Sequence, residues 1–152
     1  MVFRTMLLCY DGTREGRTAL HQGAELASAC GAFVHLLAVV RTSATSIVGE
    51  SLSSDAPFAE QTRHVEEILH EGVTRLTERG IKAQGHVALG EPIDEIARAA
   101  KTLQVDLIVL GHRTQSAFAR WWRGSVGVTL LDLSACSILI CIENPSPPET
   151  GP

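Results

Sequence analysis

The chain has 152 residues, 45% hydrophobic and 20% charged, which is typical of one globular domain with a single core. The net charge of −4 argues against the basic face that nucleic-acid binding requires. The apolar runs are too short to span a bilayer, and the amino terminus lacks a signal-peptide pattern. We therefore expect a cytoplasmic protein with no nucleic-acid or membrane partner.

Apolar runs and turn residues predict two strands and a helix in the first forty residues. Residues 5–10 form a short apolar run that ends at the turn 11–13, which indicates a buried strand followed by a helix. Apolar residues then recur at helical spacing up to Cys30, and Gly31 is suited to end that helix. Residues 33–40 hardly alternate, which is typical of a strand covered on both faces.

The middle of the chain begins with a long connection. Residues 41–57 are rich in Ser, Thr and Ala and have no sustained period, so we expect no regular structure there. A helical stripe follows over residues 65–76, and Gly80 marks its end. Residues 82–89 alternate apolar and polar positions, which favours a half-exposed edge strand.

The last part repeats the pattern of strand and helix. Residues 90–92 start a third helix, with proline in its first turn. Residues 106–110 predict a buried strand, residues 124–134 the final helix and residues 137–142 the last strand. This alternation predicts an α/β fold, an open five-stranded parallel sheet with helices on both faces.

The domain is expected to span residues 1–143, and the proline-rich tail 144–152 is expected to be disordered. The four cysteines mostly lie in apolar runs and lack C-x-x-C spacing. We expect buried, reduced thiols and no zinc site.

The stretch 106–126 has the features of an anion site. The strand breaks at Gly111 into a polar loop with three arginines, namely Arg113, Arg120 and Arg123. A new helix then begins at Gly124 and Ser125. A helix start offers unpaired N–H groups and a positive dipole end, glycine lets a phosphate approach the backbone, and serine adds a hydroxyl donor. We expect at least one of the arginines to meet a bound polyphosphate.

This stretch resembles the G-x-x-G-x9-G-S/T signature of the universal stress protein family. Gly111, Gly124 and Ser125 match three of its four positions, and Thr114 replaces the second glycine with the spacing to Gly124 kept. The resemblance runs from about residue 4 to residue 142. It includes the D-G-T turn, the G-E-P helix start and the D-L-I-V-L-G strand.

The resemblance implies a Rossmann-like sheet of order 3-2-1-4-5, with strands one and four side by side. It implies that Asp11 holds the ribose of an adenine nucleotide and that the backbone of Val39 holds the adenine. The phosphates would lie against the glycine loop and the helix start. The residues implied there are Gly111, His112, Arg113, Arg123, Gly124, Ser125 and Val126.

Thr114 works against this site. If the family glycine has positive φ or touches phosphate, a β-branched residue costs about 1–2 kcal/mol, roughly ten-fold in affinity. Each site residue also has a structural interpretation: Asp11 as a turn residue, Gly111 as a strand end, and the arginines as solvated loop residues.

The resemblance implies a stress-response protein that binds an adenine nucleotide, ATP being the expected one, as a regulatory switch read by an unknown protein partner. Mg²⁺ would accompany ATP, although no second carboxylate identifies a ligand. A homodimer through the last strand is expected. A nucleotide-independent dimeric scaffold is the alternative, and a slow ATPase is third, because no nucleophile–base constellation can be assembled.

Overall fold

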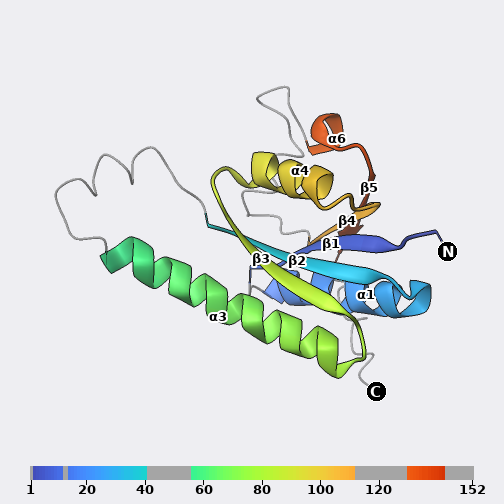
Figure 1. Cartoon of the computed structure of the whole chain (residues 1–152), viewed down its shortest axis with the longest axis horizontal. Coiled ribbons are helices and arrows are strands. Elements are labelled where there is room, and N and C mark those ends of the chain that lie inside the picture. Colours follow the sequence, from blue (N-terminus) through green and yellow to red (C-terminus); the bar gives the residue numbers. More distant parts are fainter. Residues whose placement is uncertain (1, 12–13, 41–55, 112–129, 143–152) are drawn as a thin grey trace, which may run out of the picture.

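The computed structural model describes residues 2–11, 14–40, 56–111 and 130–142. They form one parallel sheet with helices on both sides (Figure 1). The strands are β1 (Thr5–Cys9), β2 (Phe33–Val40), β3 (Ala83–Leu89), β4 (Leu107–Gly111) and β5 (Ser137–Cys141). The helices are α1 (Arg14–Cys30), α3 (Ala56–Glu78), α4 (Pro92–Thr102) and α6 (Leu130–Leu133).

The strand order is β3-β2-β1-β4-β5, and every neighbouring pair is parallel. The α/β class and the expected order are therefore confirmed. The final helix was expected over 124–134, and its described part is α6. Residues 41–55 of the expected connection and the expected tail 144–152 lie outside the described residues. The expectation of no regular structure over 41–57 is wrong for residues 56 and 57, because α3 begins at Ala56.

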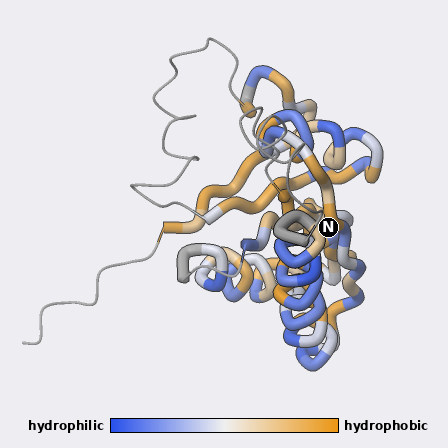
Figure 2. The backbone as a smooth tube through the Cα atoms, turned by 90° about the vertical axis from the view of Figure 1, so that its left-hand side faces the viewer, coloured by the Kyte–Doolittle hydropathy of each residue, from blue (hydrophilic) through white to orange (hydrophobic). Residues whose placement is uncertain are grey.

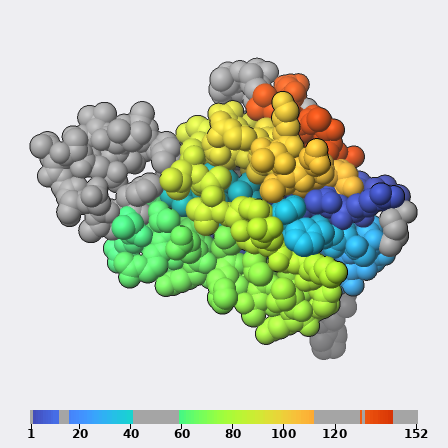
Figure 3. All heavy atoms as spheres, in the orientation of Figure 1, coloured from blue at the N-terminus to red at the C-terminus, as the bar shows by residue number. Residues whose placement is uncertain are grey.

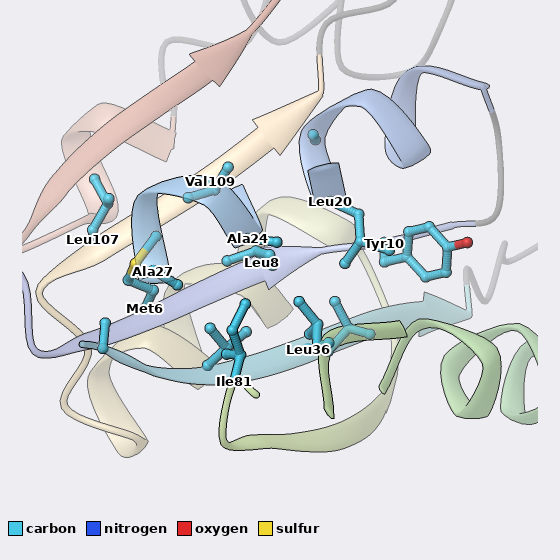
Figure 4. Packing of buried hydrophobic residues seen from close by; sticks show 14 of the residues in the cluster. Met6, Leu8, Tyr10, Leu20, Ala24, Ala27, Leu36, Ile81, Leu107 and Val109 are labelled. Atoms are coloured by element: carbon cyan, nitrogen blue, oxygen red, sulfur yellow. The ribbon is translucent and has the colours of Figure 1, made fainter. Parts of the chain in front are cut away.

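Alternate residues of the central strands enter two different cores, because successive side chains of a strand point to opposite faces. Met6 and Leu8 of β1 pack with α1 and α3, while Leu7 packs with α4 and α6. Figure 4 shows Met6 and Leu8 against Ala24 and Ala27 of α1. Figure 2 shows that apolar residues concentrate in the strands, as continuous apolar runs predict.

The predicted helix stops are confirmed. Gly31 (φ 65°) and Gly80 (φ 77°) follow α1 and α3 in the left-handed conformation that glycine adopts readily. Both lie at the amino-terminal side of the following strand, so they turn the chain back into the sheet.

β3 is an edge strand, as its alternation predicts, but its apolar positions are only partly covered. Gly85 faces α3, and a Cβ there would meet Leu69 and Val73 at 3.0–3.2 Å. Val87 and Leu89, farther along the same face, are 36% and 49% exposed. The alternation of apolar and polar residues therefore predicts correctly that β3 is an edge strand, but it does not predict that its apolar side chains are buried.

The four cysteines are free thiols. Cys141 is buried, but Cys9, Cys30 and Cys136 are half-buried, so the expected burial holds fully only for Cys141. None of the helices within the described residues is long and apolar enough to cross a membrane.

Candidate functional site

The strand order reverses between β1 and β4, which lie side by side at the centre of the sheet. Met6 pairs with Leu107 and Leu8 with Val109. From β1 the chain enters α1, on the face that α3 also covers, whereas α6, which follows β4 in the described chain, lies on the opposite face with α4 (Figure 1). In open α/β sheets, ligands bind beyond the carboxyl ends of two adjacent strands whose following connections leave on opposite faces of the sheet.

Asp11 and Gly111 lie at this reversal of strand order. Gly111 is the last residue of β4, and the register Leu8↔Val109, continued by two residues, sets Tyr10 opposite it. Asp11 therefore follows directly beyond the level of Gly111, with its side chain exposed. The structure thus brings together two residues that are separated by a hundred positions in the sequence.

Val39 lies on the neighbouring strand at the same level. Cys9 pairs with Leu37, so two residues farther along each strand Asp11 stands level with Val39. The carbonyl of Leu37 accepts a hydrogen bond from the N–H of Tyr10 at 2.9 Å, which shows that Leu37 directs its backbone groups toward β1.

Backbone direction alternates along a strand, so Val39 also directs its N–H and C=O toward the side of β1. β1 ends at Cys9, and these two groups therefore point over its end. A donor and an acceptor on one residue, next to an exposed carboxylate, can hydrogen-bond the edge of a base and a sugar hydroxyl.

Cys9 is the last residue of β1, two residues before Asp11, and is half-buried. Burial first, and the negative charge of Asp11 second, raise the pKa of the Cys9 thiol well above its usual range. A thiol that stays protonated is neither a strong nucleophile nor a metal ligand. Cys9 also packs against the core that contains Leu7 and Leu37, as a small partly buried residue.

Sequence reasoning did not single out Tyr10. Its ring is 2% exposed and its hydroxyl is buried without a hydrogen-bond partner among the described residues. Figure 4 shows the hydroxyl pointing away from the labelled core residues. The available signal was an aromatic residue with a polar tip at the end of an aliphatic run, directly before Asp11.

The predicted phosphate-binding residues lie outside the described part of the chain. These are His112, Arg113, Arg123, Gly124, Ser125 and Val126, together with Thr114 and Arg120. Their contacts stay predictions, as does Mg²⁺. Within the described residues, no group of three or more His, Cys, Asp or Glu side chains is arranged to hold a metal ion.

Comparison with known proteins gives consistent matches over most of the chain. Residues 3–141 match the model of the Universal stress protein family. The chain is 32% identical over 148 residues to the universal stress protein YxiE of Bacillus subtilis (strain 168), an alignment that covers 91% of this chain and 99% of YxiE.

Solved structures of other universal stress proteins share the fold. The universal stress protein from Archaeoglobus fulgidus in complex with dAMP has a TM-score of 0.64 and 16% identity, covering 92% of this chain and 98% of its own. The Arabidopsis thaliana universal stress protein family protein At3g01520 with AMP bound has a TM-score of 0.63 and 14% identity, covering 93% and 92%.

Proposed function

The chain belongs to the universal stress protein family, and from this premise we propose that it binds an adenine nucleotide across the carboxyl ends of β1 and β4. The observation that carries the proposal is the meeting of Asp11, Val39 and Gly111 at the reversal of strand order. The binding of dAMP and AMP by proteins of the same fold supports it.

Each of these residues has a distinct role in the proposal. The backbone N–H and C=O of Val39 bind the adenine, and the carboxylate of Asp11 accepts from the ribose hydroxyls. Gly111 lets the nucleotide approach the end of β4, because it has no side chain. His112, Arg113, Arg123 and the helix start at Gly124, Ser125 and Val126 bind the phosphates.

ATP is the ligand we propose, accompanied by Mg²⁺, because three arginines and a helix start offer more charge than one phosphate requires. The protein acts as a cytoplasmic regulatory switch, in which the bound nucleotide orders the loop 111–124 for a protein partner. Four free cysteines are consistent with a reducing compartment. The nucleotide-binding domain spans residues 1–143.

The alternative function is a nucleotide-independent dimeric scaffold. One observation favours it: β5 is an edge strand with exposed apolar side chains near it. Ile142, directly after β5, is 59% exposed, and Leu133 on α6 is 43% exposed. An apolar strand edge can pair with a second copy of the chain. The proposed homodimer through β5 is compatible with either function.

The test is a thermal-shift measurement with ATP, ADP and AMP, each with and without Mg²⁺. A ligand at about 100 times its Kd adds roughly 2.7 kcal/mol and raises Tm by several degrees. Asp11→Asn should reduce the shift, whereas Asp94→Asn, an exposed aspartate on α4, should retain it. No shift at millimolar nucleotide refutes the proposal in favour of the scaffold, and phosphate release on incubation with ATP identifies an ATPase.

A further inference from the structure

Two histidines far apart in the sequence contact each other through their ring nitrogens, between the edge strand β3 and its neighbour β2. His35 lies on β2 and His86 on β3, where the register pairs His35 with Gln84 and Leu37 with His86. The two histidines are therefore diagonal neighbours on the face that α4 covers. Nδ1 of His35 is 2.8 Å from Nε2 of His86, and the ring centroids are 5.0 Å apart.

These distances describe an N–H···N hydrogen bond, because the two nitrogens lie between the rings at bonding separation. Two neutral imidazoles form this bond with one donor and one acceptor. One added proton keeps it, since an imidazolium can donate to the neutral partner. A second added proton places an N–H and a positive charge on each side of a 2.8 Å gap, and the bond is lost.

The surroundings offer little to stabilise a second charge. Burial lowers the pKa of both histidines, and the charge of His86 lowers the pKa of His35 further. Phe33 stacks at a tilt on His35 from the same strand, with centroids 4.9 Å apart. From α4, Glu95 and Arg98 line the same pocket of about 210 Å³ as His86, and they pair with each other at 2.5 Å.

Two other groups complete this environment. Lys82 precedes β3 and adds a positive charge on the same side of the strand by alternation, while Gln84 opposite His35 is neutral. α3 packs on the other face of β3. Among the described residues that face the pair, the single carboxylate is thus already bound to an arginine.

We propose that the His35–His86 pair is an acid-sensitive latch that holds β3 on β2. β3 is the edge of the sheet and β2 is its one neighbouring strand in the described sheet, so cross-strand repulsion can be relieved by moving β3 outward. Figure 3 shows β3 at the surface between α3 and α4, with no described element outside it. The second proton opens this edge and widens the pocket under α4.

The direction of the effect follows from the lowered pKa values. A histidine whose pKa is lowered in the folded state binds fewer protons there than in the open state. The latch is therefore fully closed above the ordinary pKa of 6.5 and weakens as the pH falls below it. If opening takes up one proton, the fraction of molecules with β3 open rises about ten-fold for each unit by which the pH falls.

The test uses substitutions that keep the hydrogen-bonding atoms but remove the titration. In the variant His35→Asn with His86→Gln, the asparagine amide nitrogen takes the position of Nδ1 as donor, and the glutamine amide oxygen takes the position of Nε2 as acceptor. His70→Gln, at an exposed position of α3, is the matched control. Hydrogen exchange of residues 82–90 is measured from pH 7.5 to 5.0, corrected for intrinsic exchange, with residues 5–9 of β1 as reference.

In the parent chain and in His70→Gln we expect the protection of residues 82–90 to fall about ten-fold per pH unit below 6.5, while β1 stays protected. The double variant should show no such slope. An equal slope in the double variant, or a flat response in the parent chain, overturns the proposal. If the double variant does not fold, imidazole NMR titration of the parent decides: independent steps near 6.5 for His35 and His86 refute the latch.

Discussion

Gly72→Ala should destabilise the protein, even though alanine is the better helix former. Gly72 of α3 lies directly against the sheet. A Cβ at this position would lie 2.5 Å from Cδ2 of Leu36 and 3.1 Å from Cδ1 and Cε1 of Tyr10. Leu36 is fully buried and Tyr10 is 2% exposed, so neither side chain has free space to move into.

The expected loss follows from two opposing terms. Alanine gains about 1 kcal/mol over glycine inside a helix. Non-bonded carbons prefer about 3.5–4.0 Å, so Leu36 or the helix has to move by roughly 1 Å, and overpacking of this kind costs about 1–3 kcal/mol. With a contact as short as 2.5 Å we take the upper part of that range. The net loss is then about 1–2 kcal/mol, or roughly 2–8 °C in Tm.

Urea and thermal unfolding without nucleotide measure this difference. Thr74→Ala, at an exposed position of the same helix, is the control, because it changes helix propensity without adding a contact to the sheet. A gain of about 1 kcal/mol in Gly72→Ala would refute the reasoning, since it would mean that α3 shifts away from Leu36 at no cost.

Three further predictions test other parts of the molecule. Asp106 accepts hydrogen bonds from the N–H groups of Arg4 (2.8 Å) and Thr5 (3.2 Å), so Asp106→Ala should lower the free energy of unfolding in urea by about 1–3 kcal/mol, and no change would show that β1 starts without this support. Cys9 is half-buried and its burial raises its pKa, so its labelling by a thiol reagent at pH 8 should be slower than in urea, and equal rates would contradict the raised pKa. Thr114→Gly should tighten nucleotide binding about ten-fold by isothermal calorimetry, and unchanged affinity would remove the strain argument.

The elements of this fold were predictable because their signals are local. Residues 33–40 form an apolar run that reads as a buried strand, and Gly31 and Gly80 stop helices at positive φ. The strand order could not be predicted in this way, because hydrophobic periodicity identifies strands and helices but not which strands are neighbours in the sheet. It came from the resemblance carried by Gly111, Gly124 and Ser125.

The juxtaposition of Asp11, Val39 and Gly111 was predictable only once the order of the strands was known, and their role in binding stays a prediction. Asp11 and Gly111 meet because β1 and β4 are adjacent, and Val39 joins them through the register of β2. The pair of His35 and His86 was missed, because a contact across 51 residues depends on the β2–β3 register, which no local pattern encodes. Both do occupy strand positions that share a face, and this is the signal that a known register would have exposed.

The latch and the proposed nucleotide site share strand β2, which allows their coupling to be tested. His35 and Val39 lie on the same face of β2, and Val39 pairs with Ala88 of β3. The backbone groups of Val39 point toward β1, but the next residue, Val40, accepts a hydrogen bond from the N–H of Gly90 after β3. If protonation moves β3 outward, this bond next to Val39 is lost, and adenine binding weakens. Linkage is reciprocal, so a saturating ligand should in turn shift the opening of β3 to lower pH.

Adenosine is the ligand for this test, because it carries no phosphate that titrates between pH 5 and 7.5. Its Kd should rise as the pH falls in the parent chain and stay constant in the variant carrying His35→Asn and His86→Gln. A Kd with the same pH dependence in both proteins would mean that β3 opens without disturbing Val39. The nucleotide site and the latch would then be independent devices on one strand, because a coupling free energy of zero leaves each equilibrium unaffected by the other.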